Sequence, residues 1–172
     1  MLRETQLKSR NYQRILKQLK LCDISGGVWI DAGCGRGSYT FPLASLADKV
    51  VAIDNNPYNI SFLKSSLPSN SNIEVFKKDF TYEVWHEPVD GMLFGFSLHY
   101  DPTPQKALQK AFTQLKPDGT IVILDYVRTD PVPWVPFPLP IFKLRSLLEE
   151  VGFYQIETIH QNNRFYIVQG RK

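Results

Sequence analysis

Residues 28–37 read Val-Trp-Ile-Asp-Ala-Gly-Cys-Gly-Arg-Gly, and this stretch decides the fold class. An apolar run ends in Asp31, and three glycines follow at alternate positions: Gly33, Gly35 and Gly37. Glycine lets the backbone turn sharply and approach a ligand without a Cβ in the way. Residues 38–44 then resemble the start of a helix. The stretch therefore predicts a strand, a glycine loop and a helix, the unit that binds nucleotides in α/β folds.

The glycine spacing and Asp31 together narrow the class of ligand. The dinucleotide fingerprint is Gly-x-Gly-x-x-Gly, whereas the third glycine here comes one residue earlier. A carboxylate at Asp31 would repel a pyrophosphate but attract an ammonium group. Backbone N–H groups near a helix N-terminus bind carboxylates. A nucleoside that carries a zwitterionic amino acid meets both conditions, and S-adenosylmethionine is such a molecule.

Two further acids end the strands that are expected next along the chain. Residues 50–54 read Val-Val-Ala-Ile-Asp, so Asp54 and the following Asn55 come at about the 20-residue interval at which nucleoside-binding folds place a ribose-binding acid. A carboxylate accepts hydrogen bonds from two vicinal hydroxyls at once. Residues 73–80 end in Asp79 and Phe80. Acids at the ends of successive strands indicate one shared ligand site.

These motifs resemble those of the class I S-adenosylmethionine-dependent methyltransferases over residues 25–170. Residues 31–37 are similar to the family's first motif, Asp/Glu-x-Gly-x-Gly-x-Gly, and residues 89–100 to its region that faces the transferred methyl group. In the family, an acid at the place of Asp79 receives the adenine amino group, and Phe80 would pack near the ring. The resemblance implies a set of cofactor-binding residues: Asp31, Gly33, Cys34, Gly35, Gly37, Asp54, Asn55, Asp79, Phe80 and Phe96.

Alternating strand and helix patterns predict an α/β protein, a three-layer α/β/α sandwich with a mostly parallel seven-stranded sheet. The predicted strands are 28–31, 50–54, 73–79, 91–97, 120–126, 153–160 and 164–169. The predicted helices are 37–47, 57–67, 104–116 and 141–151. Residues 115–120 are similar to the family's turn before the fifth strand, and Gln161-Asn162-Asn163 is expected to form a hairpin turn. The antiparallel C-terminal hairpin strand that follows is a feature that the resemblance also implies.

Two segments allow alternative interpretations within a single domain of residues 1–172, in which 25–172 form the Rossmann-like core. Residues 5–21, within the N-terminal segment 1–24, form an amphipathic helix that either covers one side of the cofactor pocket or acts as a basic arm for an anionic partner. The proline-rich residues 130–140 are either a rigid connector, with Trp134 and Phe137 packed on the core, or a wall of the acceptor pocket.

Composition excludes several classes of protein. The chain has 172 residues, a net charge of +3 and two cysteines, Cys22 and Cys34. The charge is too mild to favour nucleic acid, and the cysteines have the spacing of neither a disulfide framework nor a zinc site. No signal peptide is evident, and no apolar run approaches the length of a membrane span. We therefore expect a cytoplasmic protein without a bound metal.

Methyl transfer from a sulfonium needs alignment first, and a general base is needed when the acceptor must lose a proton. The candidate catalytic residues are His99 and Tyr100, which follow the fourth strand, and Asp125, which ends the fifth; Asp101 is a further candidate base. The pKa of histidine near neutrality suits proton transfer.

The sequence leaves four functions open. The first is methyl transfer to a small-molecule acceptor, because the Asn/Asp-Pro-Pro-Tyr/Phe motif of amino-group methyltransferases is missing and no cysteine pair of the kind used for cytosine or uracil C5 methylation is present. The second is a protein or RNA acceptor. The third is a nicotinamide-dependent oxidoreductase, and the fourth is a non-catalytic domain that binds the cofactor. The oligomeric state is open.

Overall fold

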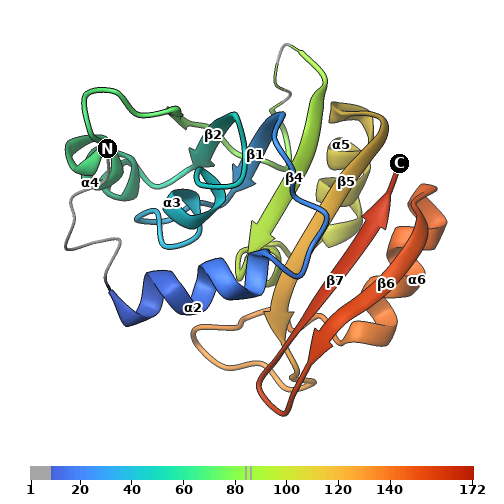
Figure 1. Ribbon diagram of the computed structural model, residues 1–172. Coiled ribbons are helices and arrows are strands. Elements are labelled where there is room, and N and C mark those ends of the chain that lie inside the picture. The colour runs from blue at the N-terminus through green and yellow to red at the C-terminus, as the bar shows by residue number, and fades with distance from the viewer. Residues whose placement is uncertain (1–8, 84, 86) are drawn as a thin grey trace.

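The computed structural model describes residues 9–83, 85 and 87–172, and Figure 1 shows its elements. Its strands are β1 (Val28–Ala32), β2 (Lys49–Asp54), β3 (Ile73–Lys77), β4 (Val89–Gly95), β5 (Leu115–Tyr126), β6 (Tyr154–Gln161) and β7 (Phe165–Arg171). Its helices are α2 (Arg10–Leu19), α3 (Thr40–Leu43), α4 (Pro57–Ser66), the 3₁₀ helix η1 (Leu98–Tyr100), α5 (Pro104–Gln114) and α6 (Ile141–Val151). Residues 5–8 of the predicted N-terminal helix lie outside the described residues.

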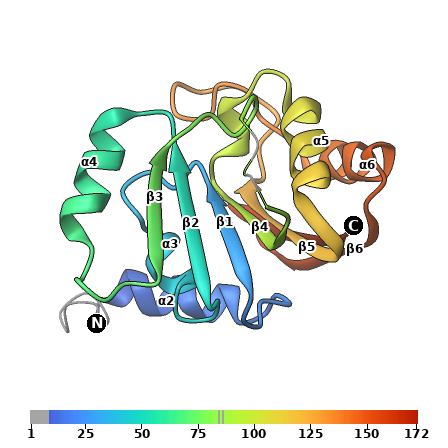
Figure 2. The ribbon, with the colours of Figure 1, turned by 90° about the horizontal axis from the view of Figure 1, so that it is seen from above.

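The strands of the described residues form one seven-stranded sheet in the order β3-β2-β1-β4-β5-β7-β6. Neighbours among β1 to β5 pair in parallel, and β7 runs antiparallel to both β5 and β6. Figure 2 shows α2 and α3 on one side of this sheet and α5 and α6 on the other. The predicted three-layer sandwich with a C-terminal antiparallel hairpin is therefore confirmed.

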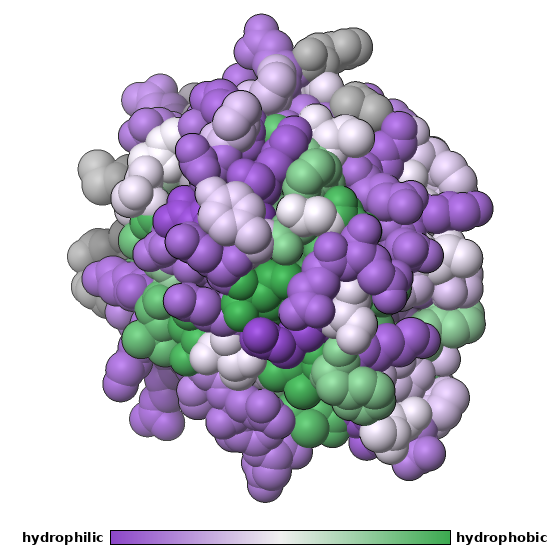
Figure 3. Space-filling model, turned by 90° about the vertical axis from the view of Figure 1, so that its right-hand side faces the viewer, coloured by the Kyte–Doolittle hydropathy of each residue, from purple (hydrophilic) through white to green (hydrophobic). Residues whose placement is uncertain are grey.

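Burial on both faces explains why the central strands read as continuous apolar runs. In β5, Val122 and Leu124 join the core beneath α2, α3 and α4, whereas Ile121 and Ile123 join the core beneath α5 and α6. Figure 3 views the side of the molecule on which α6 and β6 lie, where polar residues surround the exposed apolar ones. Within the described ranges, none of the helices has the length and apolar character to cross a bilayer.

Two predicted local structures are wrong. A helix is predicted over 37–47, but the structure has only the short α3 (Thr40–Leu43) there. After Leu43 the chain forms turns, because its backbone groups bond to the segment before β1: Gly26 N donates to Leu46 O, and Asp48 N donates to Gly27 O. The turn predicted over 115–120 belongs to β5, where Leu115 pairs with Val89.

The proline-rich segment is a connector, but with different anchors from those predicted. Val135 and Leu139 are buried, whereas Trp134 is 60% and Phe137 is 46% exposed. The segment is held by two hydrogen bonds, from Phe137 N to His99 O at 3.1 Å and from Tyr166 Oη to Leu139 O at 2.6 Å. Residues 130–140 do not line the main cavity, so the segment forms no wall of that cavity.

Candidate cofactor and acceptor site

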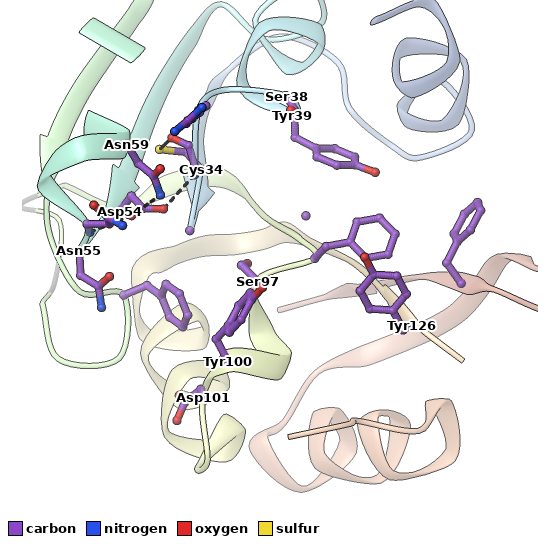
Figure 4. Close-up of a pocket in the computed structure, with 18 of the residues that line it drawn as sticks. Cys34, Ser38, Tyr39, Asp54, Asn55, Asn59, Ser97, Tyr100, Asp101 and Tyr126 are labelled. Carbon is purple, nitrogen blue, oxygen red and sulfur yellow. Dashed lines mark hydrogen bonds between the residues drawn. The ribbon is translucent and has the colours of Figure 1, made fainter. Parts of the chain in front are cut away.

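A cavity of about 1220 Å³ opens at the carboxyl ends of β1 to β5. The order of the strands reverses between β1 and β4, and open α/β sheets bind ligands in the crevice at such a point. Figure 4 shows Asp54, Asn55 and Asn59 at one end of the cavity and Tyr39 and Tyr126 at the other. We call these the polar end and the aromatic end. The volume exceeds the roughly 300–1,000 Å³ of a typical small-ligand pocket, so two ligands have room side by side.

The glycine loop forms the floor between the two ends. Gly33 has φ +74°, and a Cβ there would lie 2.4 Å from Ser97 Cβ. Gly35 has φ +53° and faces open space, because no atom lies within 4 Å of the place that a Cβ would take. The N–H groups of Gly33 and Cys34 both donate to Ile53 O at 2.9 Å, which joins the loop to the end of β2. The absence of side chains thus lets Gly33 pack closely against Ser97 and lets Gly35 present its backbone to open space.

Asp54 ties the glycine loop to α4. Its Oδ2 accepts a hydrogen bond from Gly35 N at 2.9 Å, and its Oδ1 accepts from Asn56 N at 2.8 Å and from Asn59 Nδ2 at 3.2 Å. A carboxylate has about four acceptor positions, so three protein donors leave one for a ligand hydroxyl. Asp54 lines the cavity, as predicted for a ligand-binding acid.

The end of β3 completes the polar end. Asn55 Nδ2 donates to Asp79 Oδ2 at 3.4 Å, and Thr81 N donates to Asp79 Oδ1 at 2.9 Å. The Phe80 ring packs edge-on against Phe94, with 5.4 Å between centroids. Asn55, Asp79 and Phe80 all line the cavity, so the structure brings these three predicted residues together.

Cys34 and Phe96 also line the cavity, whereas Asp31 and Gly37 do not. Asp31 is 1% exposed, and its Oδ2 accepts a hydrogen bond from Thr40 Oγ1 at 2.6 Å. A Cβ on Gly37 would lie 2.6 Å from Leu63 Cδ1. The structure therefore places Asp31 and Gly37 behind the loop, where they support it against α3 and α4.

Burial raises the pKa of Asp31 to about 7, against the opposing hydrogen bond from Thr40. The folded chain thus holds a proton here between the ordinary value of 3.8 and about 7, whereas the unfolded chain has lost it. Stability from this group is present at low pH and is lost as the pH rises toward 7.

We expect this loss to appear in urea unfolding. Between pH 5 and pH 8 the wild type should lose about 2–3 kcal/mol more unfolding free energy than Asp31→Asn, which has no proton to release. The asparagine keeps an oxygen that accepts the Thr40 hydrogen bond, which makes it a matched control. Equal pH dependence in both proteins would contradict a raised pKa at Asp31.

His99 and Asp125, two of the predicted catalytic residues, form a buried pair behind the cavity. His99 Nδ1 lies 2.7 Å from Asp125 Oδ1, and both side chains are 1% exposed. Neither lines the cavity, and His99 Nε2 and Asp125 Oδ2 are buried without a hydrogen-bond partner among the described residues. The His99 ring instead packs against Tyr100 and Tyr126, with centroids 4.4 and 5.4 Å apart. This placement suits positioning of the cavity wall better than direct proton transfer.

Tyr100 is the predicted catalytic residue that lines the cavity, and its side chain is 56% exposed. Asp101 also lines it, but its carboxylate already accepts hydrogen bonds from Thr81 Oγ1 at 3.0 Å and from Thr103 N at 2.7 Å.

Several lining residues were not predicted as site residues. Tyr39 lies two residues after the glycine loop, and Arg164 and Phe165 directly follow the hairpin turn, so their closeness to these two motifs is a signal in the sequence. Arg14 on α2 carries no such local signal, because its position depends on how α2 packs across the sheet. Asn11, Ile15 and Gln18 of α2 line the cavity beside it, at the place that the interpretation of a covering helix gives to this segment.

Comparison with known proteins identifies a family and a curated relative. Residues 24–168 match the family described as "Methyltransferase domain". A curated relative, the 23S rRNA (uracil(1939)-C(5))-methyltransferase RlmD of Vesicomyosocius okutanii subsp. Calyptogena okutanii, is 29% identical over 126 residues. These residues are 72% of this chain and 28% of the relative, so the chain spans little more than a quarter of that protein's length.

Two solved structures share the fold across nearly the whole chain. A SAM-dependent methyltransferase from Aquifex aeolicus has a TM-score of 0.75 at 20% identity, and the match covers 99% of this chain and 94% of the other. The 1,6-didemethyltoxoflavin-N1-methyltransferase of Burkholderia thailandensis has a TM-score of 0.72 at 18% identity, with 99% and 81% covered. The family match over residues 24–168, together with the glycine loop and the acids at the ends of β2 and β3, shows that the chain belongs to the methyltransferase domain family, within the class I S-adenosylmethionine-dependent methyltransferases.

Proposed function

We propose that this chain transfers a methyl group from S-adenosylmethionine to a small-molecule acceptor. The observation that carries the proposal is one continuous cavity with two chemically different ends, one polar and one aromatic. The polar end suits a nucleoside, and the aromatic end suits an acceptor with an aromatic ring. The same fold holds such a pair in the Burkholderia enzyme, whose structure contains 1,6-didemethyltoxoflavin and S-adenosylhomocysteine.

The residues at the polar end fit the cofactor chemically. Asp54 has an acceptor position left for a ribose hydroxyl, and Asp79 would accept from the adenine amino group with Phe80 beside the ring. Gly35, which carries no Cβ and faces open space, would let the amino-acid part approach the loop. When bound, the cofactor supplies a methyl group already activated by a positive sulfur.

The chain's own task is then alignment and exclusion of water. The ends of β4 and β5 meet where Phe96 N donates to Leu124 O at 2.9 Å, and this bond fixes Phe96 and Tyr126 at the centre of the aromatic end. Tyr100 lies between the two ends and would contact the reacting groups (Figure 4). Holding two reactants in this way contributes through proximity rather than through acid–base chemistry.

The His99–Asp125 pair would act as a positioning unit for Tyr100 and Tyr126. We expect His99→Ala to lower stability by about 3 kcal/mol, because it leaves Asp125 buried without its partner. His99→Asn, whose amide nitrogen replaces Nδ1 as a donor, should recover most of the stability and keep kcat within about tenfold of the wild type, with an unchanged pH profile. If His99 were the general base, kcat would fall roughly 10²–10⁴-fold in both variants. The acidic limb of the plot of kcat against pH would also disappear.

RNA is the second candidate acceptor, because the curated relative acts on 23S rRNA. Methylation at uracil C5 requires a thiolate that adds to the ring, and both cysteines are unsuited to this. Cys22 and Cys34 are buried, and burial raises the pKa of Cys22 to about 12 and that of Cys34 further above its ordinary value. The chemistry named for that relative is therefore not favoured here.

The test is turnover with S-adenosylmethionine labelled in its methyl group, in a lysate depleted of its own cofactor. We expect label to enter dialysable compounds. Label in RNA or protein would replace the small-molecule acceptor with a macromolecule. Cofactor binding without transfer to any fraction would mean a non-catalytic binding domain.

A further inference from the structure

Four aromatic rings meet at the aromatic end of the cavity, with Phe96 at their centre. Its ring centroid lies 4.7 Å from that of Tyr126, 6.0 Å from that of Tyr39 and 6.1 Å from that of Phe165. Phe96 has φ +58°, a conformation that bulky residues rarely adopt. The rings come from the segment after the glycine loop and from the ends of β4, β5 and β7, and they pack against one another, so they form one aromatic wall against which a flat ligand could stack.

Two arginines carry the charge at this end. Arg14 on α2 and Arg164 in the β6–β7 turn line the cavity and are exposed to solvent. Within the described ranges, neither arginine forms a salt bridge; Arg14 Nη2 donates to Asn11 Oδ1 at 2.8 Å. Among the residues that the structure describes, the acids that line the cavity are Asp54 and Asp79 at the polar end and Asp101, which is bound to threonines. The aromatic end therefore attracts anions and repels cations.

The polar atoms of the aromatic rings are donors rather than bases. Burial raises the pKa of Tyr39 and that of Tyr126 above the ordinary value, so both hydroxyls stay protonated at neutral pH. Among the described lining residues at this end there is neither a carboxylate nor an imidazole. His160 lies beyond the wall, with its ring 5.2 Å from that of Phe165.

We infer that the methyl acceptor is a planar aromatic compound bearing a carboxylate or similar anionic group. Its ring would stack against the wall formed by Tyr39, Phe96, Tyr126 and Phe165, and its anionic group would face Arg14 and Arg164 at the rim. This inference rests on the proposed function and names the class of its substrate. An aromatic cage for an ammonium ligand would need the opposite charge at its rim.

The same geometry restricts the reacting atom. A lone pair on that atom forms the new bond to the methyl carbon, and the electron pair of the broken carbon–sulfur bond goes to sulfur. Since no lining carboxylate or imidazole among the described residues is placed to remove a proton first, the acceptor atom must hold a free lone pair at neutral pH, as a ring nitrogen or an ionised oxygen does. Any proton on a nitrogen leaves to water after transfer.

The inference can be tested with three probes that share a naphthalene ring and differ in the charge of its substituent: 2-naphthoate, 2-naphthylmethanol and 2-naphthylmethylammonium. Binding is measured by ligand-observed NMR on the full chain, both free and with S-adenosylhomocysteine. We expect naphthoate to bind about tenfold more tightly than the alcohol, and the ammonium more weakly than either. In Arg14→Gln/Arg164→Gln, naphthoate should fall to the level of the alcohol.

Lys17→Gln is the matched control, because Lys17 lies on α2 three residues after Arg14 but does not line the cavity. It should leave all three affinities unchanged. Preference for the ammonium probe, or no effect of the double arginine variant, would overturn the inference. A single-stranded oligonucleotide that displaces naphthoate and binds more tightly would also overturn it, in favour of RNA. Probe binding is also measured on the chain without S-adenosylhomocysteine. A failure of S-adenosylhomocysteine to bind would therefore count against the proposed function, while the probes still test the class of acceptor.

Discussion

Replacing Asp54 by alanine is expected to weaken the binding of S-adenosylmethionine and S-adenosylhomocysteine by about a hundredfold, which corresponds to roughly 3 kcal/mol. The variant loses the acceptor that a ribose hydroxyl would use. It also frees three donors, the N–H groups of Gly35 and Asn56 and the amide of Asn59, so that the glycine loop is no longer tied to α4. Isothermal titration calorimetry on the folded variant measures the change.

Asp90, near the start of β4, offers a matched control at the amino ends of the parallel strands, opposite the cavity. Its Oδ2 accepts a hydrogen bond from Val28 N at 2.7 Å, at the start of β1, as Asp54 accepts from the loop after β1. Asp90→Ala should lower stability and leave cofactor affinity unchanged. Wild-type affinity in Asp54→Ala, or an equal loss in both variants, would contradict the assignment of the polar end.

The second large effect is expected from Gly33→Ala, which should destabilise the fold by about 3–5 kcal/mol. The new Cβ would lie 2.4 Å from Ser97 Cβ, in a backbone conformation that alanine rarely adopts. Ser97 is buried, and its Oγ donates to Ala32 O at 2.6 Å, so it has little freedom to move. Urea unfolding measures the loss.

Gly35→Ala separates folding from binding, because both glycines have positive φ but differ in the space around them. With no atom within 4 Å of its Cβ, this variant should lose only about 1 kcal/mol of stability. The methyl group would instead project into the cavity and weaken cofactor binding. Similar instability in both variants would show that strain, and not contact with Ser97, dominates at Gly33.

The sequence predicts most of the architecture because its strands carry local signals. Runs such as residues 50–53 are apolar throughout, since the central strands are buried on both faces. Gly152 marks the end of α6, which spans the predicted 141–151. The length of α3 has no such signal. It depends on hydrogen bonds from Gly26 and to Gly27, which are set by how the chain enters β1.

The candidate site was predictable where its residues follow strands. Asp54, Asp79 and the glycine loop reach the cavity because parallel strands bring their carboxyl ends to one edge. The burial of His99 was not predictable from its neighbours in sequence, because the proline-rich segment packs across it through Phe137 N. The position of the Asp31 side chain likewise depends on packing, because its hydrogen bond with Thr40 holds it behind the loop.

One titration tests the central claim, that the polar end of the cavity is built for S-adenosylmethionine. The wild-type chain is titrated by calorimetry with S-adenosylmethionine, S-adenosylhomocysteine and NAD. We predict micromolar binding of the first two and none of NAD, because the third glycine of the loop comes one residue earlier than in the dinucleotide fingerprint. Preference for NAD, or no binding of either adenosyl compound, would contradict the account.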